Sequence, residues 1–347
     1  DFLSSLLSLK NSPLYADRIN KTFSWLDSEM FLAKSNTCAY FSAIDADSEG
    51  VEGLYYVWNY NEILEHLGDS GKEFALQYGA KNEGNWEGNN ILNRIDKDSV
   101  NDIRYEISEK NKACLSALLR KRSKRSRPGT DNKILTDWNA MLICGFLRAF
   151  VALKEKKYLS RAQGVYSFLI NNHFVDGVLY HSSCNGKLGS SGLLDDYANF
   201  IKASFFLYEV TEDPDALNFA KKLMGLVKLN FLNDDSSDFY ISDKQEKNLF
   251  LKTTNRLDTA VQSGSSIMLE NLIKGFYYFG EDANLDLVER AIKNNWVGVR
   301  RNPVSSIGYI AAAYMTLCGY QFVAIIKNVL FGKEVKNYLL KLGSFSV

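Results

Sequence analysis

The sequence is poor in histidine and proline, and its cysteines are not paired. The 347 residues include only three histidines and four prolines. The histidines are His66, His173 and His181, and none lies in an HExxH motif or beside a serine or cysteine in a nucleophile motif. We therefore expect little catalysis that depends on histidine.

The five cysteines are far apart and odd in number. They form no CxxC pair, and no histidine stands at a spacing that would complete a zinc site. This pattern is typical of a reduced compartment, so we predict a cytoplasmic protein without a metal or other cofactor. The cysteines are Cys38, Cys114, Cys144, Cys184 and Cys318.

The sequence also lacks an excess of either charge, with 41 basic and 41 acidic residues. No net field draws in nucleic acid or an anionic membrane. The basic run Arg120–Arg127 has no interleaved aromatic residues, so we interpret it as a solvated helix end that pairs with nearby acids. The uncharged stretch Ile307–Ile326 has the length of a membrane span. Because Gly319–Gln321 divides it, we predict a buried helix and strand, with no membrane or nucleic-acid partner.

What is abundant is hydrophobic sequence, at 46% of residues, which is enough for a substantial globular core. The chain begins with Asp1 rather than methionine, and its first residues lack the basic flank and apolar core of a signal peptide. We expect a fragment of a longer chain.

A dense acidic segment lies between Tyr40 and Trp58. Strand-like residues at Tyr40–Ile44 and Leu54–Trp58 flank it, which predicts a β-hairpin with carboxylates at its tip. Loop tips often carry chemistry, but a solvated turn that only keeps two strands in register would look the same. The acids are Asp45, Asp47, Glu49 and Glu52.

The same segment imitates the first half of a calcium-binding loop. Such a loop needs a bidentate glutamate at its twelfth position, and Tyr56 stands there instead. We therefore interpret the acids without calcium.

Three helix pairs follow in the second half of the chain. The first helix of each pair is apolar nearly all round, whereas the second carries a one-sided apolar stripe. This contrast fits the inner and outer rings of an all-α fold, an incomplete (α/α)6 toroid with small β-hairpin excursions at 177–183 and 239–251. We expect one domain over 1–320, with a strand and helix in 321–347 closing it. The predicted helices are 137–153, 158–170, 194–210, 216–227, 265–279 and 285–295.

Two inner-helix entrances carry candidate chemistry. In DNKILTDWN, capping explains Thr136 and Asp137 but leaves Trp138 and Asn139, which we expect at the mouth of the toroid. A tryptophan beside an amide can hold a sugar by stacking and hydrogen bonding, although a core position for the ring is an equal alternative. Asp131 lies in the loop before this helix.

The next entrance, LLDDYA, has adjacent acids. Asp195 and Asp196 could be simple partners of the helix dipole. If both line a cavity, burial and mutual repulsion would raise one pKa and leave the other acid ionised, as acid–base work on a glycosidic or enol ether bond requires. The third entrance, from Asp258 to Ser266, brings polar residues to an equivalent position.

Together these motifs resemble the thioredoxin-domain proteins related to spermatogenesis-associated protein 20. The matching segments occur in the family's order and cover the chain from near Tyr15 onward. They are FSAIDADSEGVEGLYYVW (Phe41–Trp58), GNWEGNNIL (Gly84–Leu92), RSKRSRP leading to DNKILTDWN (Arg122–Asn139), GLLDDYA (Gly192–Ala198) and DTAVQSGSS (Asp258–Ser266).

The resemblance implies an upstream thioredoxin-like domain, present as a domain or a separate chain, and a toroid similar to six-hairpin glycosidases and N-acylglucosamine 2-epimerases. This chain would hold only the later part of that toroid. It departs from the family pattern at three places: Asn132 follows Asp131 where a second acid is expected, Ala140 replaces a glycine, and the family's PSGNS segment is QSGSS here (Gln262–Ser266), without its proline and asparagine.

The prediction is therefore a carbohydrate-enzyme-like acidic cleft, of glycosidase or epimerase type, with a sugar as its ligand. The alternative is a non-catalytic interaction protein or an inactive remnant. In the enzyme reading, Asp195 or Asp196 is the general acid and a loop carboxylate is the base. The candidate catalytic residues are Asp45, Asp47, Glu49, Asp195 and Asp196, and the candidate substrate-binding residues are Asp131, Trp138, Asn139, Tyr197, Asp258 and Ser263.

Overall fold

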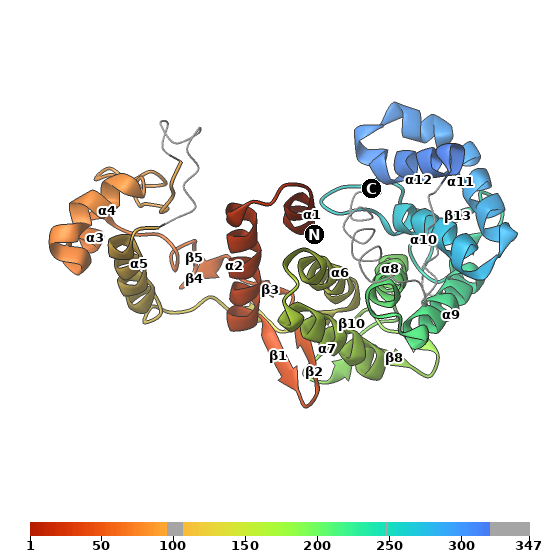
Figure 1. Ribbon diagram of the computed structural model, residues 1–347, viewed down its shortest axis with the longest axis horizontal. Coiled ribbons are helices and arrows are strands. Elements are labelled where there is room, and N and C mark those ends of the chain that lie inside the picture. Colours follow the sequence, from red (N-terminus) through yellow and green to blue (C-terminus); the bar gives the residue numbers. More distant parts are fainter. Residues whose placement is uncertain (96–106, 247–248, 320–347) are drawn as a thin grey trace, which may run out of the picture. The chain divides into compact units, whose positions relative to one another are not determined.

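The computed structural model describes residues 1–95, 107–246 and 249–319 (Figure 1). Contacts divide the chain into two compact units. Unit 1 comprises Asp1–Ser42 and the residues from Lys133 onward, and unit 2 comprises Ala43–Asn132. The predicted closing segment 321–347 lies outside the described residues, so that prediction stays a prediction.

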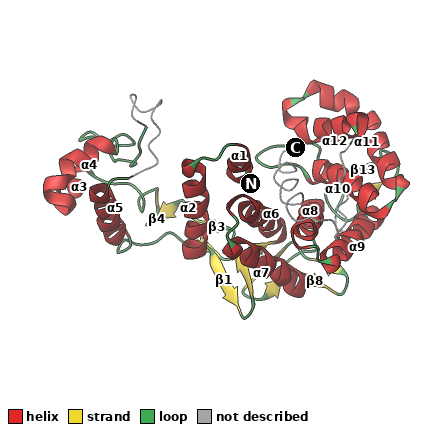
Figure 2. Ribbon diagram, in the orientation of Figure 1, coloured by secondary structure: helices red, strands yellow, loops and turns green. Residues whose placement is uncertain are grey.

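Unit 1 is built from helical hairpins, which Figure 2 shows as helices joined by short strands and loops. The six predicted helices are all present, with ends within about six residues of the expected positions. Within the described residues, two further α-helices precede them and one follows them. The helices are α1 (Phe2–Leu9), α2 (Pro13–Glu29), α6 (Thr136–Leu153), α7 (Lys156–His173), α8 (Leu194–Thr211), α9 (Pro214–Asn230), α10 (Gly264–Phe279), α11 (Asp282–Arg301) and α12 (Ile307–Cys318).

The first helices of successive hairpins pack against one another. Helix α6 contacts α1 and α8, and α10 contacts α8 and α12. Eleven of the 16 residues of α10 are buried, but only six of the 20 in α11. Inner helices buried all round and outer helices buried on one side are the arrangement of an α/α toroid, here incomplete, as predicted from the periodicity.

Local sequence explains where these helices start and stop. Asp213 accepts a hydrogen bond from the amide of Asp215 and precedes Pro214, which suits the first turn of α9. Ser263 caps α10 by accepting from the amide of Ser266. The same helix ends at Gly280, which takes the left-handed conformation with φ 67°.

Small strands connect the hairpins of unit 1 and position its polar residues. The excursion predicted at 177–183 is confirmed, whereas the later one begins earlier, at Leu232. Pairing of β10 with β7 ties the connection after α7 to the residues just before α6. The strands are β7 (Ile134–Leu135), β8 (Phe174–Val175), β9 (Val178–Leu179), β10 (Ser182–Cys184), β11 (Lys187–Leu188), β12 (Leu232–Asn233) and β13 (Asp238–Phe239).

Helix α6 is long and apolar enough to cross a membrane by length and composition. Ten of its 18 residues are buried inside unit 1, which is the situation of a core helix. The uncharged stretch from Ile307 onward forms α12 up to Cys318, and its continuation lies outside the described residues.

Unit 2 is a small helical body with its own core. Helices α3 (Tyr60–Leu67), α4 (Gly71–Gln77) and α5 (Glu109–Arg122) pack around Phe74 and Ile63. Strand β3 (Ala43–Ile44) pairs with β6 (Thr130–Asp131) where the chain enters and leaves the unit.

The predicted hairpin between Tyr40–Ile44 and Leu54–Trp58 is wrong. Tyr40 ends β2 (Thr37–Tyr40), whose partner is β1 (Phe31–Lys34), and Trp58 bridges to Asn90. The acidic segment instead folds on itself as β4 (Asp47–Ser48) and β5 (Val51–Glu52). Positive φ angles of 55° at Glu49 and 78° at Gly50 suit this two-residue turn.

Helix α2 ends at Glu29, and Phe31 already belongs to β1. Strand propensity at Tyr40–Ile44 and Leu54–Trp58 was visible in the sequence, but the long-range partners that decide strand pairing were not.

Candidate functional site

The site lies in unit 1, where two inner helices and one strand begin close together. The amide of Thr136 donates to the carbonyl of His181 over 2.9 Å, which holds His181 beside the first turn of α6. Asp137 belongs to that turn, and Asp196 belongs to the first turn of α8. One nitrogen or oxygen atom from each of Asp137, His181 and Asp196 lies within 4.8 Å of the others.

Asp196 is fully buried and is surrounded by donors. Its Oδ1 accepts from the amide of Asp137 over 3.0 Å, and its Oδ2 accepts from the amide of Leu193 over 2.8 Å. His181 Nδ1 lies 2.9 Å from the same Oδ2. Asp196 has no exposed surface, and its hydrogen bond holds the imidazole of His181 through Nδ1.

The environment raises the pKa values of all three residues of this cluster. Burial and the charge of Asp196 raise the pKa of Asp137 to about 6. Hydrogen bonding to Asp196 raises the pKa of His181. Burial raises the pKa of Asp196, and its hydrogen bonds from His181, Leu193 and Asp137 oppose that rise.

The side chain of His181 remains 29% exposed. The structure gives Nδ1 the contact with Asp196, and within the described residues no protein group is hydrogen-bonded to Nε2. An imidazole held through one nitrogen and open at the other is the usual arrangement of a proton-transfer group.

His173 lies nearby but has a structural role. The hydroxyl of Thr136 donates to the carbonyl of Tyr180, so it must accept from His173 Nδ1 at 2.7 Å. The hydroxyl of Ser183 then donates to Nε2 at 2.8 Å. Burial lowers the pKa of His173 to about 4, which agrees with this neutral tautomer.

Carboxylates also link the starts of successive inner helices. Asp196 accepts from the amide of Asp137 at the start of α6, and Asp195 accepts from the amide of Gly264 at the start of α10. Asp258 accepts from the amides of Ser263 and Gly308, at the starts of α10 and α12. These amides have no partner within their own helix, so the acids satisfy neighbouring helix starts, and Asp196 also accepts from Leu193 at the start of its own helix.

The predicted sugar-binding residues lie in different surroundings. Trp138 is 48% exposed and available to a ligand. Asn139 is buried and clamps the backbone N–H and carbonyl of Tyr40, so it does not face the mouth. Tyr197 is buried with its ring against Phe231, which leaves no ring face for a sugar. Ser263 is the buried cap of α10.

The predicted loop acids belong to unit 2. Asp45 accepts from the amide of Asp47, and Glu49 accepts from the hydroxyl of Ser126 over 2.7 Å. Asp131 lies in β6, opposite Ala43. The role of these acids as a base for Asp195 or Asp196 stays a prediction.

The cluster of Asp137, His181 and Asp196 has ligand types that a divalent cation could use. Both oxygens of Asp196 and the Nδ1 of His181 are, however, already engaged in hydrogen bonds. The arrangement therefore fits proton transfer better than metal binding.

Sequence reasoning singled out the adjacent acids but missed His181. No local motif marks this histidine, because its position depends on the pairing of β10 with β7. The only available signal was the alternation of apolar and polar residues in the strand-like segment that contains His181.

The chain is similar to curated proteins over part of their length. No protein-family model matches the chain. Spermatogenesis-associated protein 20 from Rattus norvegicus is 26% identical over 277 residues, which is 68% of this chain and 35% of the relative. The chain is similar to spermatogenesis-associated protein 20. The human protein of that name is 24% identical over 277 residues, again 68% of this chain and 35% of the relative.

An uncharacterised protein of Caenorhabditis elegans is 27% identical over 274 residues, or 68% of this chain and 37% of the relative. The chain thus spans about a third of the length of the curated relatives it matches.

Two solved structures resemble this chain in fold at low sequence identity. A family 76 glycoside hydrolase α-mannanase from Bacteroides thetaiotaomicron gives a TM-score of 0.44 at 12% identity, covering 98% of this chain and 84% of the other. Cellobiose 2-epimerase from Spirochaeta thermophila gives 0.39 at 17% identity, covering 47% and 43%. Neither likeness assigns an activity to this chain.

Proposed function

We propose that unit 1 performs acid–base chemistry on a carbohydrate, with His181 and Asp137 as the groups that exchange protons. The observation that carries this proposal is the hydrogen bond between His181 and the fully buried Asp196. It fixes the orientation of the imidazole and favours its protonated form. This revises the predicted roles, because the buried Asp196 orients the acid and does not donate the proton itself.

Asp137 supplies the second group. With a pKa of about 6 it is mostly ionised at neutral pH, while hydrogen bonding to Asp196 raises the pKa of His181 and favours the protonated imidazole. His181 then donates a proton to a leaving or carbonyl oxygen, and Asp137 accepts one. Activity should increase as pH rises through about 6 and decrease as His181 loses its proton above 6.5.

The carbohydrate class rests on the half-exposed indole of Trp138, the neighbour of Asp137. Its apolar face can stack on a sugar ring while carboxylates bond the hydroxyls. We also propose that the protein acts in the cytoplasm, since none of its five cysteines forms a disulfide bond.

The test is turnover of a disaccharide and monosaccharide panel in D₂O, followed by NMR. Release of a reducing end indicates hydrolysis, and deuterium at C2 indicates epimerisation. His181→Gln should abolish either signal, whereas His66→Gln, an exposed histidine of unit 2, should leave it unchanged.

The alternative, a non-catalytic interaction protein or remnant, predicts no turnover of any sugar by the folded protein. It would also be favoured if His181→Gln and His66→Gln retained equal activity.

A further inference from the structure

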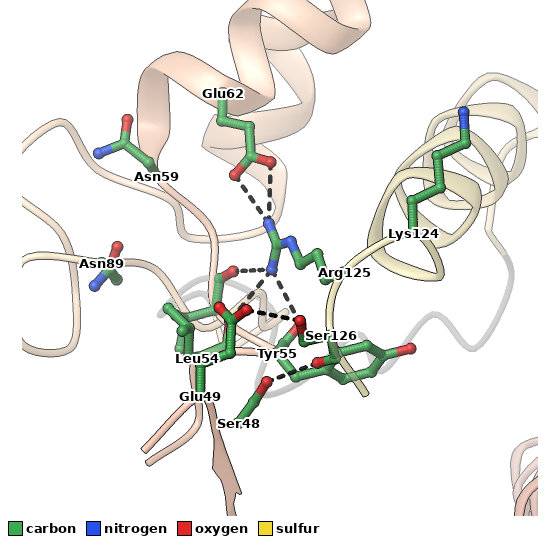
Figure 3. Close-up of a pocket in the computed structure, with 11 residues that line it drawn as sticks. Ser48, Glu49, Leu54, Tyr55, Asn59, Glu62, Asn89, Lys124, Arg125 and Ser126 are labelled. Atoms are coloured by element: carbon green, nitrogen blue, oxygen red, sulfur yellow. Dashed lines mark hydrogen bonds and ion pairs between the residues drawn. The ribbon is translucent and has the colours of Figure 1, made fainter. Parts of the chain in front are cut away.

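Unit 2 contains a polar pocket that the proposed function does not use (Figure 3). Its volume is about 450 Å³, within the range of roughly 300 to 1,000 Å³ that is common for small-molecule sites. Four segments contribute to its wall: the turn from Ser48 to Val57, the start of α3, the loop residue Asn89, and residues 124–126 after α5.

Arg125 is the fixed part of the pocket. One guanidinium nitrogen donates to the carbonyls of Tyr55 and Val57 over 3.0 and 2.7 Å. The other donates to both carboxylate oxygens of Glu62 over 3.1 and 2.9 Å, and the guanidinium lies 4.2 Å from the ring centre of Trp58. Its charge is therefore neutralised and its position fixed, so Arg125 shapes the pocket rather than offering a free cation.

Other lining groups retain hydrogen-bonding capacity. Glu49 uses one oxygen to accept from Ser126, as Figure 3 shows. The ammonium of Lys124 has no protein partner within the described ranges, and the same holds for the side-chain amide of Asn89. The side-chain NH₂ of Asn59 is also unused there, because this residue caps α3 through its oxygen.

The lining has no net charge. Arg125 and Lys124 provide two cations, and Glu62 and Glu49 provide two carboxylates. An anionic ligand would meet the carboxylate of Glu49, and a cationic ligand would meet Lys124. A neutral ligand with many hydroxyls could accept from Lys124 and the amides and donate to Glu49, while Tyr55 offers an aromatic surface.

We propose that this pocket binds a neutral saccharide unit. Its ligand class follows from the lining alone, so it does not depend on the acid–base chemistry proposed for unit 1. The pocket would give unit 2 a binding role of its own.

The test uses the full chain and NMR binding titrations with a matched set of sugars. The set contains neutral glucose, mannose and N-acetylglucosamine disaccharides, with glucose 6-phosphate, glucuronate and glucosamine as charged counterparts. We expect a neutral sugar to bind more tightly than the charged ones. Glu49→Gln should weaken that binding about tenfold, because hydrogen bonds to charged groups contribute about 1.5 to 3 kcal/mol.

Glu52→Gln is the matched control, because Glu52 belongs to the same small hairpin but does not line the pocket. It should bind as the wild type does, and so should His181→Gln, which separates this pocket from the site in unit 1. Equal thermal unfolding of the Glu49→Gln and Glu52→Gln variants shows that the fold is intact.

Three results would overturn the proposal: no neutral sugar binds the folded chain, a charged sugar binds more tightly than its neutral counterpart, or Glu49→Gln and Glu52→Gln weaken binding equally.

Discussion

Two acidic segments of similar composition behave in opposite ways in this protein. At the start of α8, Asp196 is fully buried and Asp195 is mostly covered. In the β4–β5 hairpin of unit 2, Asp47 and Glu49 are exposed. The difference lies in the donors available to each segment.

The α8 acids meet backbone amides of other helices, which have no partner within their own helix. Burial is tolerated there because each carboxylate replaces water with fixed donors. The acids in and beside the hairpin accept from a nearby amide or an exposed hydroxyl, as Asp45 does from the amide of Asp47 and Glu49 does from Ser126. Acidic side chains are buried where the free amides at helix starts need hydrogen-bond acceptors. They remain in solvent where the backbone amides of the turn already have partners.

Asp196→Ala should have the largest effect. It leaves the amides of Asp137 and Leu193 and the imidazole of His181 without their acceptor, so we expect a loss of about 3 to 5 kcal/mol in the free energy of unfolding. Asp45→Ala, just before the hairpin, should cost about 0.5 kcal/mol or less. Urea denaturation measures both, and equal losses would remove the distinction between the two segments.

Arg125→Met should come next, because it removes the hydrogen bonds to Glu62 and to the carbonyls of Tyr55 and Val57. We expect a loss of about 2 to 3 kcal/mol in the unfolding free energy of unit 2. Its neighbour Lys124 is exposed, so Lys124→Met should change stability little. Losses of similar size would show that Arg125 does not organise the pocket.

Asp137→Asn should stabilise unit 1 in a pH-dependent way. The pKa of Asp137 is raised from 3.8 to about 6, so folding favours its protonated form. Below pH 3.8 Asp137 is protonated in both the folded and the unfolded state, so it costs no stability. Between pH 3.8 and about 6 the unfolded state ionises first, so the free energy of unfolding decreases, and above about pH 6 this loss is constant.

We expect Asp137→Asn to gain about 1 to 2 kcal/mol at pH 7.5, allowing for partial exposure, and little at low pH. Thermal unfolding at both pH values measures the difference. A gain of the same size at both would contradict the raised pKa.

The smallest effect should come from the exposed hairpin itself. Asp47→Asn leaves the backbone pairing of Asp47 with Glu52 intact, so stability should change by less than about 0.5 kcal/mol. Urea denaturation would detect a larger loss, which would mean that the carboxylate of Asp47 has a structural partner.

The sequence predicted the inner and outer helices well, because their apolar periodicity is local information. The sequence also indicated Asp195 and Asp196 as candidate functional residues. It could not place His181 or reveal that Tyr197 and Asn139 are buried, since those positions depend on strand pairing and on contacts such as Asn139 with Tyr40. The β3–β6 pairing joins residues almost ninety positions apart, which explains why the predicted hairpin was wrong.

The most direct test of the proposed proton-transfer group is an NMR titration of the imidazole of His181 in the wild type and in Asp196→Asn. We predict that the pKa of His181 lies above 6.5 in the wild type and falls in the variant, while His173 stays neutral down to a pH of about 4 in both. A His181 pKa that is the same in both proteins would contradict the role assigned to Asp196.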